Sequence, residues 1–187
     1  MRLPPPLIGI LARRLVQGLI AKGTIASDHP EKTVDKVTRL ITADLAIEDE
    51  LTEKARLILL DRQDQIKGQD LEYHALLAKA KSQLASQRGY TLSTGPDRLS
   101  REKVQDFTGQ IFTLLLEDRD VEYFVKDPDL RLAVLRGLEH ELARDEARSE
   151  KARQKVRNIK RHIPEESPEF HALFMQFYKE LLERESC

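Results

Sequence analysis

Several residue types are scarce in this chain of 187 residues, and each shortage excludes a class of protein. The only cysteine is Cys187, so no disulfide can form within the chain, and the sequence suits a reducing cytosol. No apolar run approaches the roughly 20 residues of a membrane span. Arg13 and Arg14 interrupt the apolar N-terminal stretch, unlike a secretory signal. We therefore expect a cytoplasmic protein that does not enter a membrane.

Charge is abundant but balanced. Charged residues make up 34% of the chain, yet the formal net charge is −1, so no global field favours nucleic acid or an anionic membrane. Tryptophan is absent and aromatic residues make up only 5%, while Leu, Ala, Glu, Lys and Arg dominate, as in long helices. The composition predicts an all-α protein in which any binding of a polyanion depends on a local patch.

An internal repeat is the strongest pattern in the sequence. The segment 72–77 (Glu-Tyr-His-Ala-Leu-Leu) returns 97 positions later at 169–174 (Glu-Phe-His-Ala-Leu-Phe), and 53–56 (Glu-Lys-Ala-Arg) returns at 150–153. Nearer the start of the chain the matching positions are 96 apart, as for Leu3 and Leu99. These ordered matches predict two tandem units, 1–88 and 99–187, joined by a turn-rich linker at 89–98.

Each unit is predicted to hold a short, a long and a short helix. Apolar spacing places the first helices at about 6–22 and 100–117, and the long ones at about 30–65 and 127–161. Ser100, Asp127, Asp70 and Ser167 are the expected N-caps. A helix of ~34 residues is ~50 Å long, which exceeds what one unit can cover. The units are therefore expected to pack as a pseudo-two-fold helical bundle.

Apolar stripes identify the expected core of each helix. All six phenylalanines lie in the second unit, so its core should be the bulkier. The predicted core residues are Leu7, Ile8, Leu11, Leu15, Leu19, Val34, Val37, Ile41, Leu45, Leu51, Ala55, Ile58, Tyr73, Leu76, Leu77, Ala80 and Leu84 in the first unit, and Val104, Phe107, Ile111, Leu115, Leu130, Val134, Leu138, Leu142, Ala152, Val156, Ile159, Ile163, Phe170, Leu173, Phe174, Phe177 and Leu181 in the second.

The same order of segments resembles a bacterial family known as domain of unknown function 507. The second unit carries the resemblance over its full length, through 149–153 (Ser-Glu-Lys-Ala-Arg) and 163–170 (Ile-Pro-Glu-Glu-Ser-Pro-Glu-Phe). The first unit departs from it, with Lys-Gly-Gln-Asp at 67–70 in place of that turn. The resemblance covers essentially the whole chain, once per unit. It implies a helical cytoplasmic protein and gives no activity.

The sharpest charge feature is a run of basic residues without an acid. It is a candidate patch for RNA, DNA or an acidic protein surface. The alternative interpretation is that these cations interact with a helix C-terminus, where each gains ~0.3–1 kcal/mol. We favour the second, because acids precede the run and the first unit lacks it. The run consists of Lys151, Arg153, Lys155, Arg157, Lys160 and Arg161, followed by His162.

Two histidines and two acidic turns are weaker candidates. His74 and His171 occupy equivalent repeat positions, but neither has a His or Cys at the i+3 or i+4 spacing that would share a metal, so we interpret them as helix-edge surface residues. The acidic turns 48–50 and 145–146 are interpreted as solvated faces. No catalytic or phosphate-binding motif is present, and we expect neither a metal nor a cofactor.

These observations favour a non-enzymatic protein that acts as an interaction or scaffold module. The two long amphipathic helices need partners to bury their stripes, and a protein partner is expected to meet part of that need. The alternative is an RNA- or ribosome-binding protein that acts through 151–162. Because the basic run and the closer family resemblance lie in the second unit, we expect function there first.

Overall fold

The structure is a computed structural model that describes residues 3–61, 73–93, 99–159, 161 and 163–184. Most of the described chain is helical, so the all-α prediction is confirmed. The helices are α1 (Pro5–Ala21), α2 (Pro30–Asp61), α4 (Tyr73–Arg88), α5 (Arg101–Glu117), α6 (Asp127–Arg157) and α7 (Pro168–Arg184). Two short strands, β1 (Ile25–Ser27) and β2 (Val121–Tyr123), accompany them. Among these helices none is long and apolar enough to cross a membrane.

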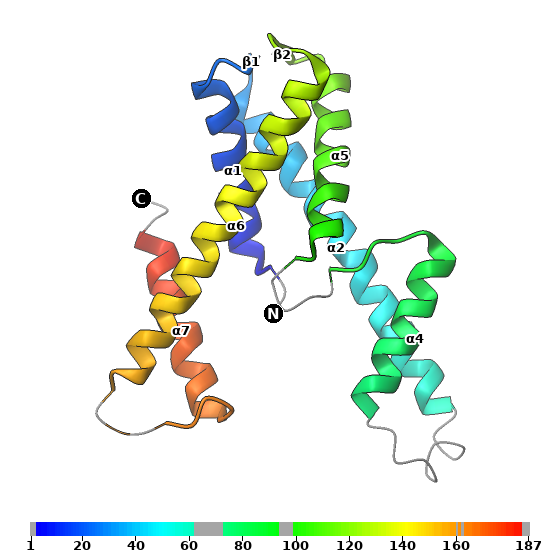
Figure 1. Cartoon of the computed structure of the whole chain (residues 1–187), viewed down its shortest axis with the longest axis vertical. Coiled ribbons are helices and arrows are strands. Elements are labelled where there is room, and N and C mark those ends of the chain that lie inside the picture. Colours follow the sequence, from blue (N-terminus) through cyan, green and yellow to red (C-terminus); the bar gives the residue numbers. More distant parts are fainter. Residues whose placement is uncertain (1–2, 62–72, 94–98, 160, 162, 185–187) are drawn as a thin grey trace.

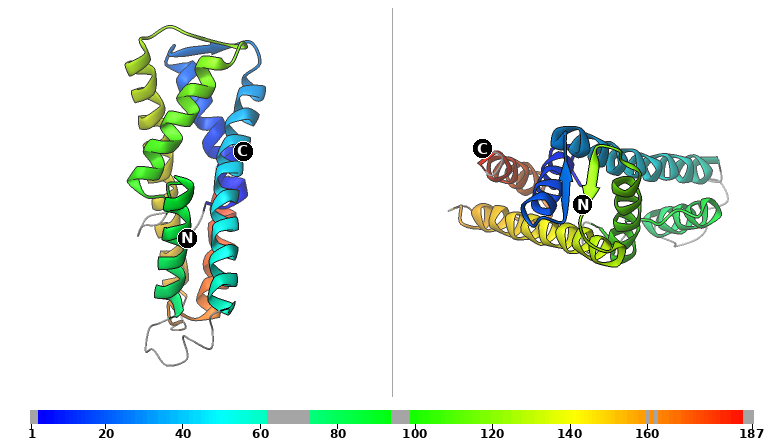
Figure 2. Two further views of the ribbon diagram at one scale, coloured as in Figure 1. Left: turned by 90° about the vertical axis from the view of Figure 1, so that its right-hand side faces the viewer. Right: turned by 90° about the horizontal axis from the view of Figure 1, so that it is seen from above.

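The helices form a central body with two arms (Figure 1). α1, α5 and the first halves of α2 and α6 make up the body, and the strands lie across one end of it. Beyond the body, α2 continues beside α4, and α6 continues beside α7. We call these pairs arm one (48–61 with α4) and arm two (145–157 with α7). Seen from the strand end, the arms point to opposite sides (Figure 2).

Local sequence explains where several helices begin. The Ser100 hydroxyl accepts a hydrogen bond from Lys103 N at 3.1 Å, and the Ser167 hydroxyl accepts one from Phe170 N at 3.1 Å, so both predicted N-caps are confirmed. The predicted cap at Asp127 is wrong by one residue. Lys126 is the N-cap, because its extended backbone directs its carbonyl to Leu130 N at 3.0 Å. The predicted cap Asp70 lies outside the described residues.

The predicted helix ends are less accurate than the starts. α1 agrees with its prediction to within one residue at each end. α6 was expected to reach 161 but ends at Arg157, where Asn158 caps it through a hydrogen bond from its N–H to Gln154 O. Of the segment 151–161, which the sequence predicts to be helical, α6 includes 151–157. α2 is described as far as Asp61, so its predicted end at 65 lies outside the described residues.

The two strands were not predicted. β1 and β2 pair antiparallel, with Ala26 opposite Glu122, and flanking bonds from Asp28 N to Asp120 O and from Phe124 N to Thr24 O extend the ladder. Each strand buries one β-branched side chain, Ile25 in β1 and Val121 in β2. Segments this short carry too few alternating residues to be read from sequence. This two-stranded β-ribbon, formed by β1 and β2, joins the first half of the chain to the second.

The core follows the predicted stripes closely in the body. Every predicted core position of α1 and α5 is buried, as are those of the first halves of α2 and α6 down to Leu45 and Leu138. In the arms the prediction is partly wrong. Ile58 is exposed and Leu59 is buried, because the stripe of α2 continues from Ala55 in a step of four. Tyr73 is also exposed, whereas Tyr178 and Leu182 of α7 are buried.

The two seams between the halves of the body differ in width. At the α1–α6 seam, an added Cβ on Gly137 would overlap the Leu15 side chain. The position 97 residues earlier, on α2, is Leu40, and Leu114 of α5 stands where α1 has Gly18. α1 and α6 consequently contact each other more extensively than α2 and α5 do. Gly137 therefore lets α6 approach α1, whereas Leu40 and Leu114 occupy the space between α2 and α5.

We expect Gly137→Leu, which copies the residue at the equivalent position 40, to lower the free energy of unfolding by about 1–3 kcal/mol. The reason is that added volume in a packed seam forces side chains and backbone to shift. Urea denaturation followed by circular dichroism measures the change. Gly109→Ala is the control, because its Cβ would meet only Arg131 Nη2 at 3.7 Å. An unchanged midpoint for Gly137→Leu would contradict the close seam.

Candidate functional site

Each long helix carries two buried carboxylates one helical turn apart. They are Asp44 and Glu48 on α2, and Glu141 and Asp145 on α6. The pairs lie 97 positions apart, at the points where the long helices leave the body for the arms. The prediction that the acidic turns are solvated is therefore wrong for Glu48 and Asp145, although their neighbours Asp49, Glu50 and Glu146 are exposed. Glu48 and Asp145 lie on the buried face of their helices, whereas the prediction treated each acidic turn as a whole.

Three side chains contact Asp44, the first acid of the pair on α2. The Lys103 side chain is 0% exposed and forms ion pairs with Asp44 and Asp106. Its ammonium also lies 4.1 Å from the centre of the Tyr90 ring, a favourable cation–π contact. Gln110 Nε2 and the Tyr90 hydroxyl each donate a hydrogen bond to Asp44 at 3.0 Å. This cluster fixes α5 and the segment after α4 to α2.

Glu48 holds the root of arm one. Its carboxylate accepts hydrogen bonds from Lys81 Nζ at 2.6 Å and from Ser93 N at 3.0 Å. Burial raises the pKa of Glu48, but the hydrogen bonds from Lys81 and Ser93 outweigh it, so the pKa lies below its usual value. Tyr90 shows the opposite behaviour: burial, followed by the nearby Asp44 charge, raises its pKa. At neutral pH the cluster therefore holds an ionised Glu48 and a protonated Tyr90.

The second pair has equivalent donors. Arg14 Nη1 donates to Glu141 Oε2 at 3.3 Å, from a position on α1 that corresponds to Gln110 on α5. The Tyr178 hydroxyl donates to Asp145 Oδ1 at 2.5 Å, from the position on α7 that corresponds to Lys81 on α4. Arg148 adds an ion pair to Asp145 at 2.7 Å. Each acid pair thus joins its long helix to the first helix of the other half and to its own arm helix.

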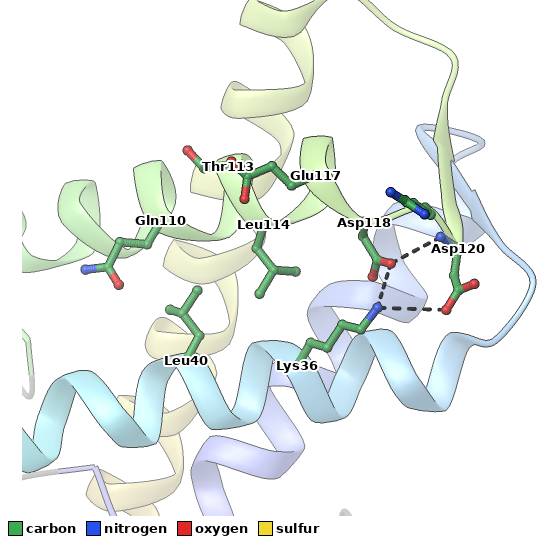
Figure 3. Close-up of a pocket in the computed structure, with 9 residues that line it drawn as sticks. Lys36, Leu40, Gln110, Thr113, Leu114, Glu117, Asp118 and Asp120 are labelled. Atoms are coloured by element: carbon green, nitrogen blue, oxygen red, sulfur yellow. Dashed lines mark hydrogen bonds and ion pairs between the residues drawn. The ribbon is translucent and has the colours of Figure 1, made fainter.

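A groove with a volume of about 700 Å³ runs between α2 and α5 (Figure 3). Leu40 and Leu114 face each other across it. Three acids and two bases line it, among them Asp118, whose side chain is only 3% exposed. Asp118 Oδ1 accepts hydrogen bonds from Lys36 Nζ at 2.6 Å and from Asp120 N at 3.1 Å. Burial raises the pKa of Asp118, but these bonds outweigh it and lower the pKa below its usual value. We call this the acidic groove.

The equivalent face between α1 and α6 has the opposite charge. It holds a pocket of about 300 Å³ with Gly18 and Gly137 among its lining residues. Arg14 of α1 and Lys22, the C-cap of α1, lie on one side, and Arg136, His140 and Arg144 of α6 on the other, with Glu141 as the acid. Lys22 stands where α5 has Asp118. We call it the basic pocket. The sequence contains a hint of this pocket, since Arg14 and Lys22 are eight residues apart and Arg136, His140 and Arg144 step by four, so each set falls on one helix face.

The predicted basic run begins in arm two, and three of its members pair with acids of the same chain. Arg157 forms ion pairs with Glu165 at 2.7 Å and Glu150 at 3.4 Å, and Arg161 forms one with Glu169. Arg153 pairs with Glu150 at 3.5 Å.

The remaining members of the run differ in their surroundings. Lys155 Nζ lies 5.3 Å from the centre of the Phe177 ring, and Lys151 is exposed. Lys160 lies outside the described residues. The ion pairs of Arg157 with Glu165 and of Arg161 with Glu169 could not be predicted from the sequence, because the acids approach the arginines only where the chain turns back into α7.

The two histidines lie apart from the clusters. His74 and His171 are both exposed, in the first turns of α4 and α7. The ring centroids of His74 and Tyr73 lie 5.9 Å apart in a T-shaped arrangement. Within the described part of the chain, no group of three or more His, Cys, Asp or Glu side chains is placed to hold a metal ion.

The fold and its sites define an all-α protein whose paired acid clusters join a body to two arms. The sequence model of the family described as "Protein of unknown function (DUF507)" matches residues 1–186. The chain belongs to that family, so the resemblance seen in the sequence is correct at this level. The match runs through both halves as one span, and one copy per half stays a prediction. No curated protein matches the chain.

We expect Glu48→Gln to destabilise the protein at neutral pH and to flatten its response to acid. A carboxylate whose pKa is lowered by folding contributes stability above its usual pKa of 4.5, and that contribution is lost as the pH falls through the lowered folded value. The free energy of unfolding, measured by urea titration between pH 7 and pH 3, should therefore fall less for Glu48→Gln than for the unsubstituted chain. Exposed Glu146→Gln is the control, and equal slopes for all three proteins would refute the assignment.

Proposed function

We propose that this protein is a non-enzymatic interaction or scaffold module that binds a protein partner in the cytoplasm. The support comes from arm one, where large apolar side chains remain in solvent. Leu57 is 64% exposed, Leu60 is 57% exposed and Tyr73 is 48% exposed. Leu57 and Leu60 lie about one turn apart on α2, and Tyr73 begins α4. Contiguous apolar surface of this kind is typical of interaction sites. This observation carries the proposal.

A comparison between the arms supports a specific role for arm one. The residues 97 positions after Leu57 and Leu60 are Gln154 and Arg157, so arm two is polar where arm one is apolar. α7 buries Phe170, Phe174, Tyr178 and Leu182. Their counterparts on α4 are Tyr73, Leu77, Lys81 and Ala85, of which Ala85 alone is buried. Arm one is the less completely packed of the two, and a partner would bury what α4 does not.

We further propose that the chain arose by duplication of one unit, with boundaries at 1–88 and 99–187. The element order helix, strand, long helix, helix occurs twice. The equivalent donors around the two acid pairs are a second line of support. In this proposal the body corresponds to the interface of an ancestral two-fold dimer, which the fusion made internal.

The alternative, RNA or ribosome binding through 151–162, has less support. Arg153, Arg157 and Arg161 each form an ion pair with an acid of the same chain, so a phosphate backbone would have to displace Glu150, Glu165 or Glu169. Charge reversal at Arg153 and Arg157 tests this patch. We expect the binding of bulk RNA, measured against salt concentration, to stay the same.

To test the interaction proposal, a photoreactive amino acid is placed at position 57 and, as a control, at Leu132, which is exposed on α6 in the body. We expect crosslinking in cells to yield one discrete protein adduct from position 57 and none from position 132. The double substitution Leu57→Gln and Leu60→Gln in an affinity-tagged chain should abolish capture of the crosslinked partner. The free energy of unfolding should change by about 0.5 kcal/mol or less, as is usual at exposed sites. A chain that stays monomeric by light scattering and gives no adduct at position 57 would contradict the proposal.

A further inference from the structure

The acidic groove has an apolar middle and a charged end. Leu40 of α2 and Leu114 of α5 are half-buried and face each other across it (Figure 3). Its volume of about 700 Å³ lies within the range of small-molecule sites. The charged end lies where α5 leads into β2, and its three acids outnumber its two cations: Glu117, Asp118 and Asp120 against Lys36 and Arg119. The lining therefore suits a ligand that is both aliphatic and cationic.

Asp118 has an unmet need for a hydrogen-bond donor. Its side chain is only 3% exposed, and its lowered pKa keeps the carboxylate charged at neutral pH. Oδ1 accepts hydrogen bonds from Lys36 Nζ and Asp120 N, whereas the buried Oδ2 has no hydrogen-bond partner in the part of the chain that the structure describes. A buried acceptor without a donor destabilises a protein. Because rotation of a carboxylate about its terminal torsion is soft, Oδ2 can turn toward a donor that enters the groove.

Lys36 indicates which donor fits. Its ammonium nitrogen lies 2.6 Å from Asp118 Oδ1 and 3.8 Å from Asp120 Oδ2, so one ammonium already bridges two carboxylates. Leu40 lies one turn further along the same face of α2. An ammonium group attached to an aliphatic chain thus already occupies part of the groove. Since an ammonium has three donors on a compact centre, a second one beside Lys36 could serve Asp118 Oδ2.

We propose that the acidic groove binds a linear aliphatic polyamine. One ammonium pairs with Asp118 and Asp120, and the methylene groups lie between Leu40 and Leu114. A further ammonium, nearer the middle of α5, is accepted by the exposed carboxylate of Glu117.

The length of the groove suits a molecule with more than one ammonium. Gln110, Thr113 and Glu117 line it from the same side of α5, and Gln110 lies eight positions before Asp118. At 1.5 Å per residue this separation is roughly 12 Å. Gln110 donates through Nε2 to Asp44 and keeps its carbonyl oxygen as an acceptor. An extended polyamine therefore meets acceptors at both ends of the groove and an apolar surface between them.

The acids of the groove have no counterparts on α1. Ala21 and Lys22 stand at the positions that correspond to Glu117 and Asp118. The polyamine site therefore belongs to one face of the body. It lies apart from Leu57 and Leu60 of arm one, so it does not depend on the proposed protein interaction, and either can fail without the other.

The experiment uses the full-length chain with ¹³C-labelled leucine methyl groups, and spermidine as the probe. We expect saturable shifts of the Leu40 and Leu114 methyl resonances, with nuclear Overhauser effects from the methylene protons of spermidine to these methyl groups. Glu117→Gln and Asp120→Asn should each weaken spermidine binding about fivefold, the upper end for a solvent-exposed ion pair. Glu102→Gln removes the same charge from an exposed position on α5 outside the groove and should leave binding unchanged.

A second variant tests the role of Lys36. We expect Lys36→Gln to bind spermidine more tightly, because a competing ammonium is removed from Asp118 and Asp120. Spermidine should also raise the melting temperature of this variant more than that of the unsubstituted chain, because it replaces the missing partner of a buried carboxylate. Arg39→Gln is the matched control, since it removes one positive charge from an exposed position on α2 outside the groove.

Four results would overturn the inference. The first is the absence of saturable methyl shifts at about 10 mM spermidine, an affinity weaker than that of most metabolite sites. The second is an equal loss of affinity in Glu102→Gln and Asp120→Asn, because this indicates general charge attraction. The third is an equal set of shifts with magnesium chloride at matched ionic strength, because the acids would then hold any cation. The fourth is a lysine-rich peptide that binds the same methyl groups far more tightly, because the ligand would then be a protein segment.

Discussion

The architecture depends on neutralising two carboxylates in the middle of each long helix. Leaving them buried without partners would cost several kcal/mol per charge, so the surrounding elements must supply donors. They do so from both directions: Gln110 or Arg14 from the first helix of the other half, and Lys81 or Tyr178 from the arm. The place where a long helix leaves the body is therefore fixed by charge, whereas the apolar stripes on either side fix only which face points inward.

Differences between equivalent positions give the two halves different surfaces. Gly137 lets α6 approach α1 at Leu15, while Leu40 and Leu114 face each other between α2 and α5. Lys22 and Asp118 occupy equivalent positions with opposite charge. In the arms, Leu57 and Leu60 stand where arm two has polar residues. The two halves of the chain thus present an acidic groove, a basic pocket and one apolar arm, each in a different place.

The sequence predicted the helices and most of the core, because apolar spacing depends on residues within a few turns of each other. It located Ser100 and Ser167 correctly as caps for the same reason. It failed where the partner is distant. The burial of Glu48 depends on Lys81 and Ser93, and the pairing of Arg157 depends on Glu165 across a turn. The basic pocket was missed because its two rows lie on helices more than 100 residues apart, and neither row is unusual alone.

The pairing of β1 with β2 has a kinetic consequence. Helical proteins usually fold fast because most of their contacts are local, and the adjacent pairs α1–α2, α5–α6 and α6–α7 fit that pattern. The ribbon and the Arg14–Glu141 bond do not, since the latter joins residues 127 positions apart. Closing so long a loop costs entropy that no early contact repays. We therefore expect the β1–β2 pair to form late in folding, and this chain to fold more slowly than its helix content suggests.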